Sequence, residues 1–250
     1  MKKLPAGAAV AFAIAVLGAP GASLAQVAME QISPTLTVRQ DGVGNRSLVE
    51  VSGVHEGDVT QVGDSNHAMM ISRGASRQGI AQYGSDNLGV QMSFGGANVA
   101  MLTQGSAAAA GHDNIAIQAQ VGYGNSARIV QNGSRNAAAQ VQVGPLSFTQ
   151  AAALAGGVAS DLGQGRISSR LTELSDQGSG FGNTAELTQD GDDNLAVMIQ
   201  AGDHNQMDIH QVGGAANVYV QLGDGLRRTA YVEQQAGVNG VTPITIIQSR

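Results

Sequence analysis

The sequence contains no cysteine and no tryptophan, and its aromatic residues are four Phe and four Tyr among 250 residues. The absence of cysteine excludes a disulfide framework and thiolate metal sites. Charged residues make up 13% of the chain, whereas an average soluble domain carries about 25%. So few aromatic and charged side chains argue against a conventional globular enzyme and favour a thin, repetitive architecture that buries small side chains.

Lysine is also scarce, with Lys2 and Lys3 as its two occurrences. These lysines precede an apolar stretch at residues 6–18, and small residues at 23–25 offer a cleavage site. The pattern predicts a secretory signal peptide at residues 1–25, because the apolar run is shorter than the roughly 20 residues of a transmembrane helix. The predicted mature chain has no transmembrane segment. Its 11 Arg against 19 Asp and Glu give a net charge of −8, which argues against nucleic acid as a partner.

What the sequence does contain is 35 Gly, 24 Gln and 13 Asn. Many of them fall in one pattern, Gln-x-Gly-x-x-Asn, for which chance would supply only ~0.2 intact copies. The intact copies are QDGVGN (40–45), QVGDSN (61–66), QYGSDN (82–87), QVGYGN (120–125), QNGSRN (131–136), QDGDDN (189–194) and QAGDHN (200–205). Degenerate copies between them are VSGVHE (51–56), SRGASR (72–77), SFGGAN (93–98), QVGPLS (142–147) and QVGGAAN (211–217).

Each half-repeat has the pattern of a short strand followed by a tight turn. After Asn205, the residues Met207, Ile209 and Gln211 alternate with polar residues, which is the period of a strand with one buried face. Gly, Asn and Asp in the turns tolerate a positive φ. A helix is excluded because such a breaker arrives at every step of 10 or 11 residues along the chain from Gln40.

Units of equal length with two strands and two turns stack on one another, because each coil pairs its backbone with its neighbours at about 4.8 Å. The sequence therefore predicts an all-β, amyloid-like β-solenoid with 21–22 residues per coil and about eight coils. Equivalent amides hydrogen-bond into ladders along such a stack. The predicted ladder residues are Gln40, Asn45, Gln61, Asn66, Gln82, Asn87, Gln120, Asn125, Gln131, Asn136, Gln189, Asn194, Gln200, Asn205 and Gln211. The predicted turn glycines are Gly42, Gly63, Gly84, Gly122, Gly133, Gly191 and Gly202.

Interruptions of the period divide the chain. The turn between Gln104 and Asn114 gains about five residues. Residues 145–166 lack the motif, are rich in Ala and Gly, and are expected to form a long loop or a short helix at 149–154. The predicted organisation is a signal peptide at 1–25, a lead-in at 26–33, a first array at 34–142, an insertion at 143–166 and a second array at 167–250.

The repeats resemble those of a known family. NTAELTQDGDDN (183–194), NLAVMIQAGDHN (194–205) and NSARIVQNGSRN (125–136) are similar to the curlin repeat of curli, the functional amyloid of bacterial surfaces. The resemblance covers residues 34–142 and 167–248. The C-terminal segments RTAYVEQQ (228–235) and ITIIQSR (244–250) resemble the end of the minor curlin, the nucleator subunit.

The resemblance implies a secreted structural protein. Its members leave the cell through a dedicated outer-membrane pore with accessory proteins and polymerise outside as fimbrial, pilus-like fibres that serve adhesion and biofilm matrix. The implied partners are further copies of the chain and other curlin-type subunits. A second hypothesis remains open: a monomeric surface or matrix β-solenoid adhesin that binds a ligand such as polysaccharide and does not polymerise.

No catalytic, cofactor-binding or metal-ligating residues are predicted. The Asp-rich turns lack the Gly-Gly-x-Gly-x-Asp period of Ca²⁺-binding β-rolls, and no two of the five His have the spacing of a zinc site. The Glu residues fall in different coils without pairing, so no convergent site for hydrolysis is expected. If the Gln side chains face inward, then Ile115, Ile117, Leu195, Val197 and Ile199 lie on the outer surface, where they would support sideways bundling of filaments.

Overall fold

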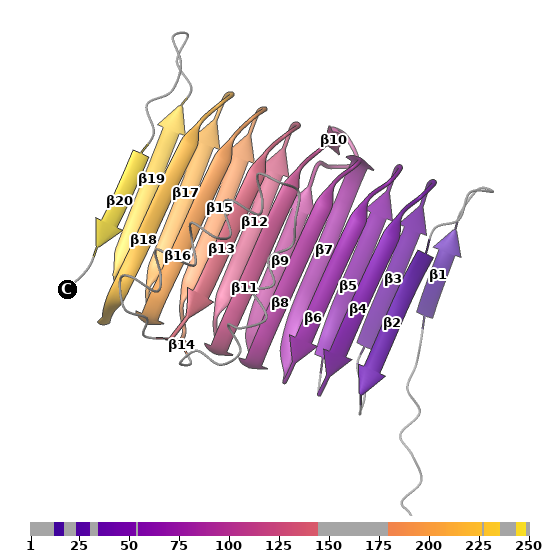
Figure 1. The fold of residues 1–250 in the computed structure, drawn as a ribbon, viewed down its shortest axis with the longest axis horizontal. Coiled ribbons are helices and arrows are strands. Elements are labelled where there is room, and N and C mark those ends of the chain that lie inside the picture. Colours follow the sequence, from indigo (N-terminus) through magenta and orange to yellow (C-terminus); the bar gives the residue numbers. More distant parts are fainter. Residues whose placement is uncertain are drawn as a thin grey trace, which may run out of the picture.

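The computed structural model describes residues 13–17, 24–30, 35–53, 55–144, 180–226, 228–235 and 244–248. All regular elements in this part of the chain are strands, and they form two parallel sheets (Figure 1). Sheet A contains β1 (Ala13–Leu17), β3 (Thr35–Asp41), β5 (His55–Val62), β7 (Ser76–Ser85), β9 (Asn98–Gln104), β12 (Ser126–Asn132), β15 (Thr184–Asp190), β17 (Gln206–Val212), β19 (Thr229–Gln235) and the short β10 (Gly111–His112). Sheet B contains β2 (Leu24–Glu30), β4 (Arg46–Ser52), β6 (His67–Arg73), β8 (Leu88–Gly96), β11 (Ile115–Tyr123), β13 (Ala137–Val143), β16 (Leu195–Asp203), β18 (Asn217–Leu226), β20 (Ile244–Gln248) and the short β14 (Gly180–Phe181).

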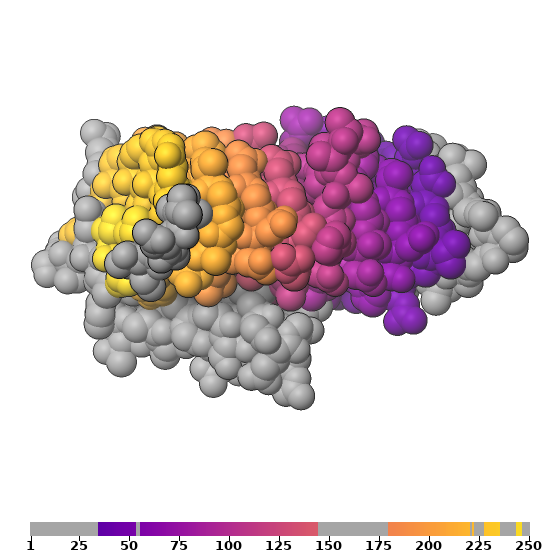
Figure 2. Space-filling model, turned by 90° about the horizontal axis from the view of Figure 1, so that it is seen from above, coloured from indigo at the N-terminus to yellow at the C-terminus, as the bar shows by residue number. Residues whose placement is uncertain are grey.

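The chain passes alternately from one sheet to the other, so that successive coils stack along one axis. Figure 2 shows this progression, with the colours advancing from indigo to yellow along the long axis of the molecule. From β3 to β20 the described strands make eight coils. Equivalent residues lie 21 residues apart in the early coils, as for Gln40 to Gln61, and 22 or 23 apart in the last ones, as for Gln189 to Gln211 and Gln211 to Gln234. The predicted all-β solenoid is confirmed.

The strands form because apolar or amide side chains alternate with polar ones. Along β3, every second residue is buried and the residues between are exposed. The inward residues Leu36 and Val38 are 4% and 0% exposed and belong to a core cluster that runs between the two sheets. This interior is narrow, which is why Ala, Val, Leu, Ile and Met suffice to fill it without large aromatic side chains.

Two insertions interrupt the stack, and both split the repeated motif before its third residue. In the fourth coil Gly111, not Gly105, pairs with Gly84 of the preceding coil, so five extra residues precede it. In the next coil Gly180 pairs with Gly122, and residue separations across the coil rise from 22 to 58. The 36 residues 144–179 are therefore inserted between Val143 and Gly180. The turn continues as Gly180-Phe181-Gly182-Asn183, so Gly180, and not Gly144, takes the glycine position of the motif that begins at Gln142.

Several predictions fall on residues that the structure does not describe or describes by backbone alone. The loop or helix predicted for 145–166, and residues 167–179 of the predicted second array, lie outside the described residues. Backbone strands β1 and β2 pair with β3 and β4, and β1 lies within the predicted signal peptide. Removal of the leader stays a prediction.

One expectation about the surface is wrong. Ile117, Val197 and Ile199 do face away from sheet A, because their neighbour Gln118 and its equivalents point inward, but they are 0%, 3% and 0% exposed. They belong to a second apolar cluster on the outer side of sheet B, which we call the outer patch. The outer patch consists of Val90, Met92, Ile117, Ala119, Val121, Ala139, Val141, Val143, Val197, Ile199 and Ala201.

Candidate functional site: the amide ladders

The turns that lead from sheet A to sheet B lie along one side of the solenoid, here called the first edge. A glutamine stands at the same position of each coil along this edge, and each side-chain amide is buried. The Nε2 of each Gln donates to Oε1 of the Gln in the next coil towards the C-terminus, at 2.7–3.4 Å. The ladder runs through Gln40, Gln61, Gln82, Gln104, Gln131, Gln189, Gln211 and Gln234.

An asparagine ladder runs parallel to this one along the first edge. Asn45 Oδ1 accepts hydrogen bonds from the backbone N–H and the Nδ2 of Asn66, at 2.9 and 3.2 Å. Asn66 Nδ2 in turn donates to the carbonyl of Gly84 in the following coil, at 2.8 Å. The same contacts repeat through Asn87, Asn114, Asn136 and Asn194. Ala216, rather than Asn217, takes the next position and donates its backbone N–H to Asn194.

The two ladders give the stack a direction. Side-chain donation between glutamines runs towards the C-terminus, whereas donation between asparagines runs towards the N-terminus. A buried amide costs free energy unless its hydrogen bonds are made, and a donor facing a donor makes none. A junction between two solenoids therefore keeps both ladders satisfied when the C-terminal end of one meets the N-terminal end of the other.

The predicted turn glycines hold the coils at close approach. All seven have a positive φ, between 94° and 121°. At Gly63, a Cβ atom would lie 2.1 Å from the carbonyl oxygen of Gly84, and at Gly84 it would lie 1.9 Å from that of Gly111. Any side chain there would push neighbouring coils apart and break the ladders beside it. The glycine column is thus a condition for the stacking as well as for the turn.

The turns that lead from sheet B back to sheet A form the second edge, which carries incomplete ladders. Its glutamine position holds Val51, Ser72 and Ser93 before it reaches Gln120, Gln142 and Gln200, and Leu222 follows. Gln120 donates to Gln142 at 2.9 Å, and Gln142 donates to Gln200 at 2.8 Å. The asparagine position is occupied by Asn98, Asn125, Asn183 and Asn205, whose Oδ1 atoms accept the next backbone N–H.

The structure thus brings the fifteen predicted ladder residues together in two columns at each edge. The sequence-based ladder left out Gln104 and Asn114, although their interrupted turn was recognised. It also left out Gln142 and Asn183, because the long insertion separates the two halves of their motif. It also missed Asn98, whose motif has lost its Gln, and Gln234. A third ladder of Gln91, Gln118 and Gln140 lies in mid-strand on sheet B, with bonds of 2.8 and 3.0 Å. Its signal was the presence of Gln at inward positions of three strands that pair in register.

Charge and aromatic side chains distinguish the exposed rims of the two edges. On the first edge, the guanidinium of Arg135 donates to Asp193 in the next coil at 2.7 and 2.8 Å, and this hydrogen bond lowers the pKa of Asp193. On the second edge, the rings of Tyr123 and Phe181 stack with centroids 5.9 Å apart. The two residues pair in register between β11 and β14, so the rings stack from one coil to the next.

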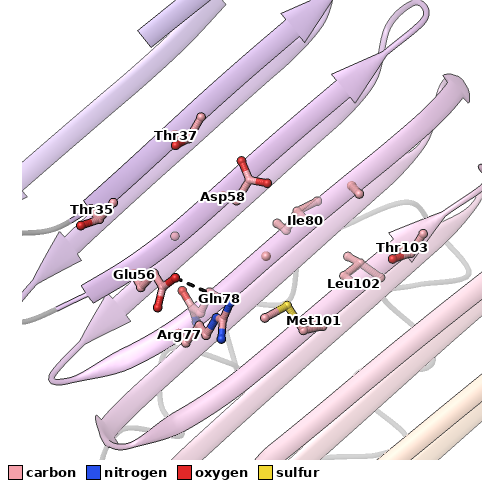
Figure 3. A pocket seen from close by; sticks show the side chains of 13 residues that line it. Thr35, Thr37, Glu56, Asp58, Arg77, Gln78, Ile80, Met101, Leu102 and Thr103 are labelled. Atoms are coloured by element: carbon pink, nitrogen blue, oxygen red, sulfur yellow. Dashed lines mark ion pairs between the residues drawn. The ribbon is translucent and has the colours of Figure 1, made fainter. Parts of the chain in front are cut away.

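A hollow of about 330 Å³ lies on sheet A near its N-terminal end (Figure 3). Gly79, Asp58 and Met101 are among its lining residues. Glu56 and Arg77, which also line it, form an ion pair at 3.6 Å. Partial burial raises the pKa of the Asp58 carboxyl. Across the described ranges, no three His, Asp or Glu side chains converge as a metal site would require. Nor does that part of the chain contain a helix long and apolar enough to cross a membrane.

Comparison with known families identifies one segment. Residues 180–213 match the family model described as Curlin associated repeat. This segment is similar to a curlin-associated repeat. The matched segment begins at Gly180, where the stack resumes after the long insertion, and contains two intact motifs. No curated protein and no solved structure matched the chain. The curlin-associated repeat and the stacked all-β fold point to a structural subunit rather than to an enzyme.

Proposed function

We propose that this protein is a secreted subunit of curli-like extracellular fibres that grow by end-to-end stacking of β-solenoids. The observation that carries the proposal is the directional amide ladder along the first edge, which passes through all eight described coils from β3 to β20. The curlin-associated repeat at residues 180–213 supports the same function. Adhesion and biofilm matrix are the roles that such fibres serve.

The ends of the stack supply the growth surface. Among the described strands, β19 and β20 pair with the solenoid on one side, and so do β1 and β2. Removal of residues 1–25 takes away β1 and makes β3 the end strand of sheet A. A strand with unpaired N–H and C=O groups is a template for another strand. Few charged or proline residues block the described end strands, since β19 contains a single charged residue, Glu233.

We further propose the minor, nucleator-like role for this subunit, with export through an outer-membrane pore and its accessory proteins. The support is the C-terminal resemblance at 228–235 and 244–250, together with interruptions that a bulk subunit built from uniform repeats would lack. A nucleator needs one end that templates a partner more than it needs uniform coils. Its expected activity is to shorten the lag of a second curlin-type chain at a small molar fraction.

Fibre formation by residues 26–250 tests the subunit proposal. The expected result is fibre growth that is detected by thioflavin fluorescence and accelerated by added seeds. X-ray fibre diffraction should show reflections at about 4.8 and 10 Å. Gln234→Glu replaces the last amide of the described glutamine ladder with a carboxylate, so we expect slower elongation. Gln235→Glu makes the same charge change at an exposed position of β19 and is the matched control. A stable monomer with β-rich circular dichroism would contradict the proposal and favour the ligand-binding adhesin.

A further inference from the structure

The outer patch is continuous across four strands of sheet B. In register, Val90 of β8 lies beside Ile117 of β11, which is followed by Ala139 of β13 and Val197 of β16. Two residues further along each strand, a second row contains Met92, Ala119, Val141 and Ile199. These side chains point away from sheet A, because the residues between them, such as Gln118, bond to the backbone of sheet A.

Burial on this side of sheet B is confined to its middle. Ile117, Ala139 and Ile199 are 0% exposed. Further towards the N-terminus, Met69 and Ile71 of β6 are half-buried, and Leu48 of β4 is 38% exposed. Tyr219 of β18 is half-buried on the other flank. Burial on the outer side of sheet B is therefore greatest over β11, β13 and β16.

Neighbouring strands alone do not bury an outward apolar side chain in this fold. On the outer side of sheet A, Val99 and Met101 of β9 and Val130 of β12 are half-buried although they too are apolar. Full burial of the outer patch requires atoms above the sheet. Among the described strands, none lies on that side of sheet B, since the two sheets face each other through the opposite side.

The chain itself leaves and returns at the patch. Val143, the last residue of β13, is a member of the outer patch, and β14 resumes beside Gly122 of β11. The 36 intervening residues are far longer than needed to span four strands at about 4.8 Å spacing. They supply apolar side chains for the contact: Leu146, Phe148, Leu154, Val158, Leu162, Ile167, Leu171 and Leu174.

We propose that residues 145–179 dock in cis on the outer patch and thereby keep this face of the solenoid from pairing with a second copy. Both tethers lie at the ends of β11 and β13, which are the middle strands of the buried area, and this accounts for the decline in burial towards β4 and β18. The sideways contacts of a filament then fall to the polar outer side of sheet A. This inference goes beyond the proposed function and does not depend on fibre growth.

Thiol labelling of the full chain tests the docking, because the sequence has no cysteine of its own. Ala119→Cys places one thiol in the patch, and Leu48→Cys places one at an exposed position on the same side of sheet B. We expect the first to react with a maleimide at least about tenfold more slowly, since reaction requires local opening. The protection should be independent of chain concentration. Equal rates, or protection that appears only as concentration rises, would overturn the proposal.

A deletion of residues 144–179 tests the identity of the cover. It joins Val143 to Gly180 and restores an intact motif, Gln142-Val143-Gly180-Phe181-Gly182-Asn183, with the 22-residue spacing of its neighbours. We expect the thiol at 119 to react as fast as that at 48 in the dilute variant, and sideways association to rise with concentration. Deletion of residues 106–110, which shortens the other interrupted motif, should leave the protection unchanged. Protection that persists in the dilute, monomeric deletion variant would contradict the docking.

A photo-crosslinker on the thiol at 119 gives a second measurement in the full chain, which does not depend on the folding of the deletion variant. The expected products are intramolecular and map to residues 145–179. Crosslinks that join two differently isotope-labelled copies, or that map outside 145–179, would overturn the proposal.

Discussion

The two turn edges of the solenoid differ in a way that separates what stacking requires from what it tolerates. The first edge carries Gln in every coil from β3 to β19. The second edge carries it in four of the eight coils, at Gln120, Gln142, Gln200 and Gln248, and has Val51, Ser72, Ser93 and Leu222 at this position in the others. The strands stay in register on both sides, apart from one shift between Gln200 and Gly202 where β16 pairs with β18. Val51 and Leu222 join the core between the sheets instead.

What the edges share is the turn conformation. Gly53, Gly74 and Gly95 on the second edge have a positive φ, as do Gly42 and Gly63 on the first. The close approach of glycine to the next coil is therefore the requirement that both edges share. A continuous glutamine ladder is needed at one edge of each coil, and the first edge supplies it. A buried ladder amide has to be fully bonded to stabilise the fold, while an apolar or hydroxyl replacement avoids that demand.

The largest expected effect follows from a glycine substitution. Gly63→Ala adds a Cβ 2.1 Å from the Gly84 carbonyl oxygen at a φ of 106°, and we expect it to lower the free energy of unfolding by about 3 kcal/mol. Gly44→Ala is the control, because its Cβ would lie 3.4 Å from Ser65 Oγ, and should cost about 1 kcal/mol. Urea unfolding of the dilute protein measures both. Similar losses would show that close approach is not the requirement that the edges share.

A second comparison sets a complete ladder against a partial one. Gln82 donates to His67, Asn87 and Gln104 and accepts from Gln61. Gln82→Leu leaves these partners in the buried interior without their hydrogen bonds to residue 82. We expect it to lower the free energy of unfolding by about 3 kcal/mol.

The partner experiment is Gln120→Leu on the second edge. Gln120 donates to Val99 and Gln142, and its Oε1 has no partner among the described residues. We expect Gln120→Leu to lower the free energy of unfolding by about 1 kcal/mol. A loss at Gln120 as large as that at Gln82 would mean that the edges are energetically equivalent despite their different ladders.

The Oε1 of Gln120, which has no hydrogen-bond partner among the described residues, offers a way to stabilise the second edge. Ser93 lies beside Gln120 in register and bonds Ser76 at 2.9 Å. Ser93→Gln places a donor next to Gln120 Oε1, and we expect a gain of about 1 kcal/mol in the free energy of unfolding. Ser93→Ala measures the cost of losing the serine pair. If the gain persists when Gln120 is also changed to Leu, it does not come from the ladder.

The period of the sequence was enough to predict the columns that carry intact motifs. Gln40, Gln61 and Gln82 stack because equal spacing places them at equal positions in successive coils. The period failed where an insertion moved half of a motif away, as with Gln142 and Asn183, which are 41 residues apart in sequence and belong to one turn. Local sequence cannot show this, since the two halves meet only through pairing with β11.

The burial of the outer patch could not be predicted from the sequence, for a different reason. Alternation along a strand gives the direction of Ile117 or Ile199 relative to Gln118, and that direction was predicted correctly. Exposure depends on what lies over the sheet, and period-2 alternation contains no such information. The side chains were therefore expected at the surface, whereas they are buried.

The smallest expected effect concerns the charged rim of the first edge. The hydrogen bond from Arg135 lowers the pKa of Asp193 below its ordinary value of 3.8. A carboxylate with a lowered pKa in the folded chain contributes stability above its ordinary pKa and loses that contribution as pH falls through the lowered value. Both side chains are exposed, so the effect is local. We expect amide exchange in the turn at Ser134 to speed up relative to that at Gly124 on the second edge between about pH 4 and pH 2.

Two variants identify the group responsible for this change. Asp193→Asn removes the titrating carboxyl and should abolish the acid-induced change that Asp193 causes, while the hydrogen bond from the Ser134 backbone N–H to Asp192 Oδ1 at 2.8 Å stays in place. Arg135→Leu removes the donor and should abolish the contribution of Asp193 at every pH. If both edges respond to acid alike, and if Asp193→Asn changes nothing, the carboxylates of the first edge do not distinguish it. Its difference from the second edge would then lie in the buried amides alone.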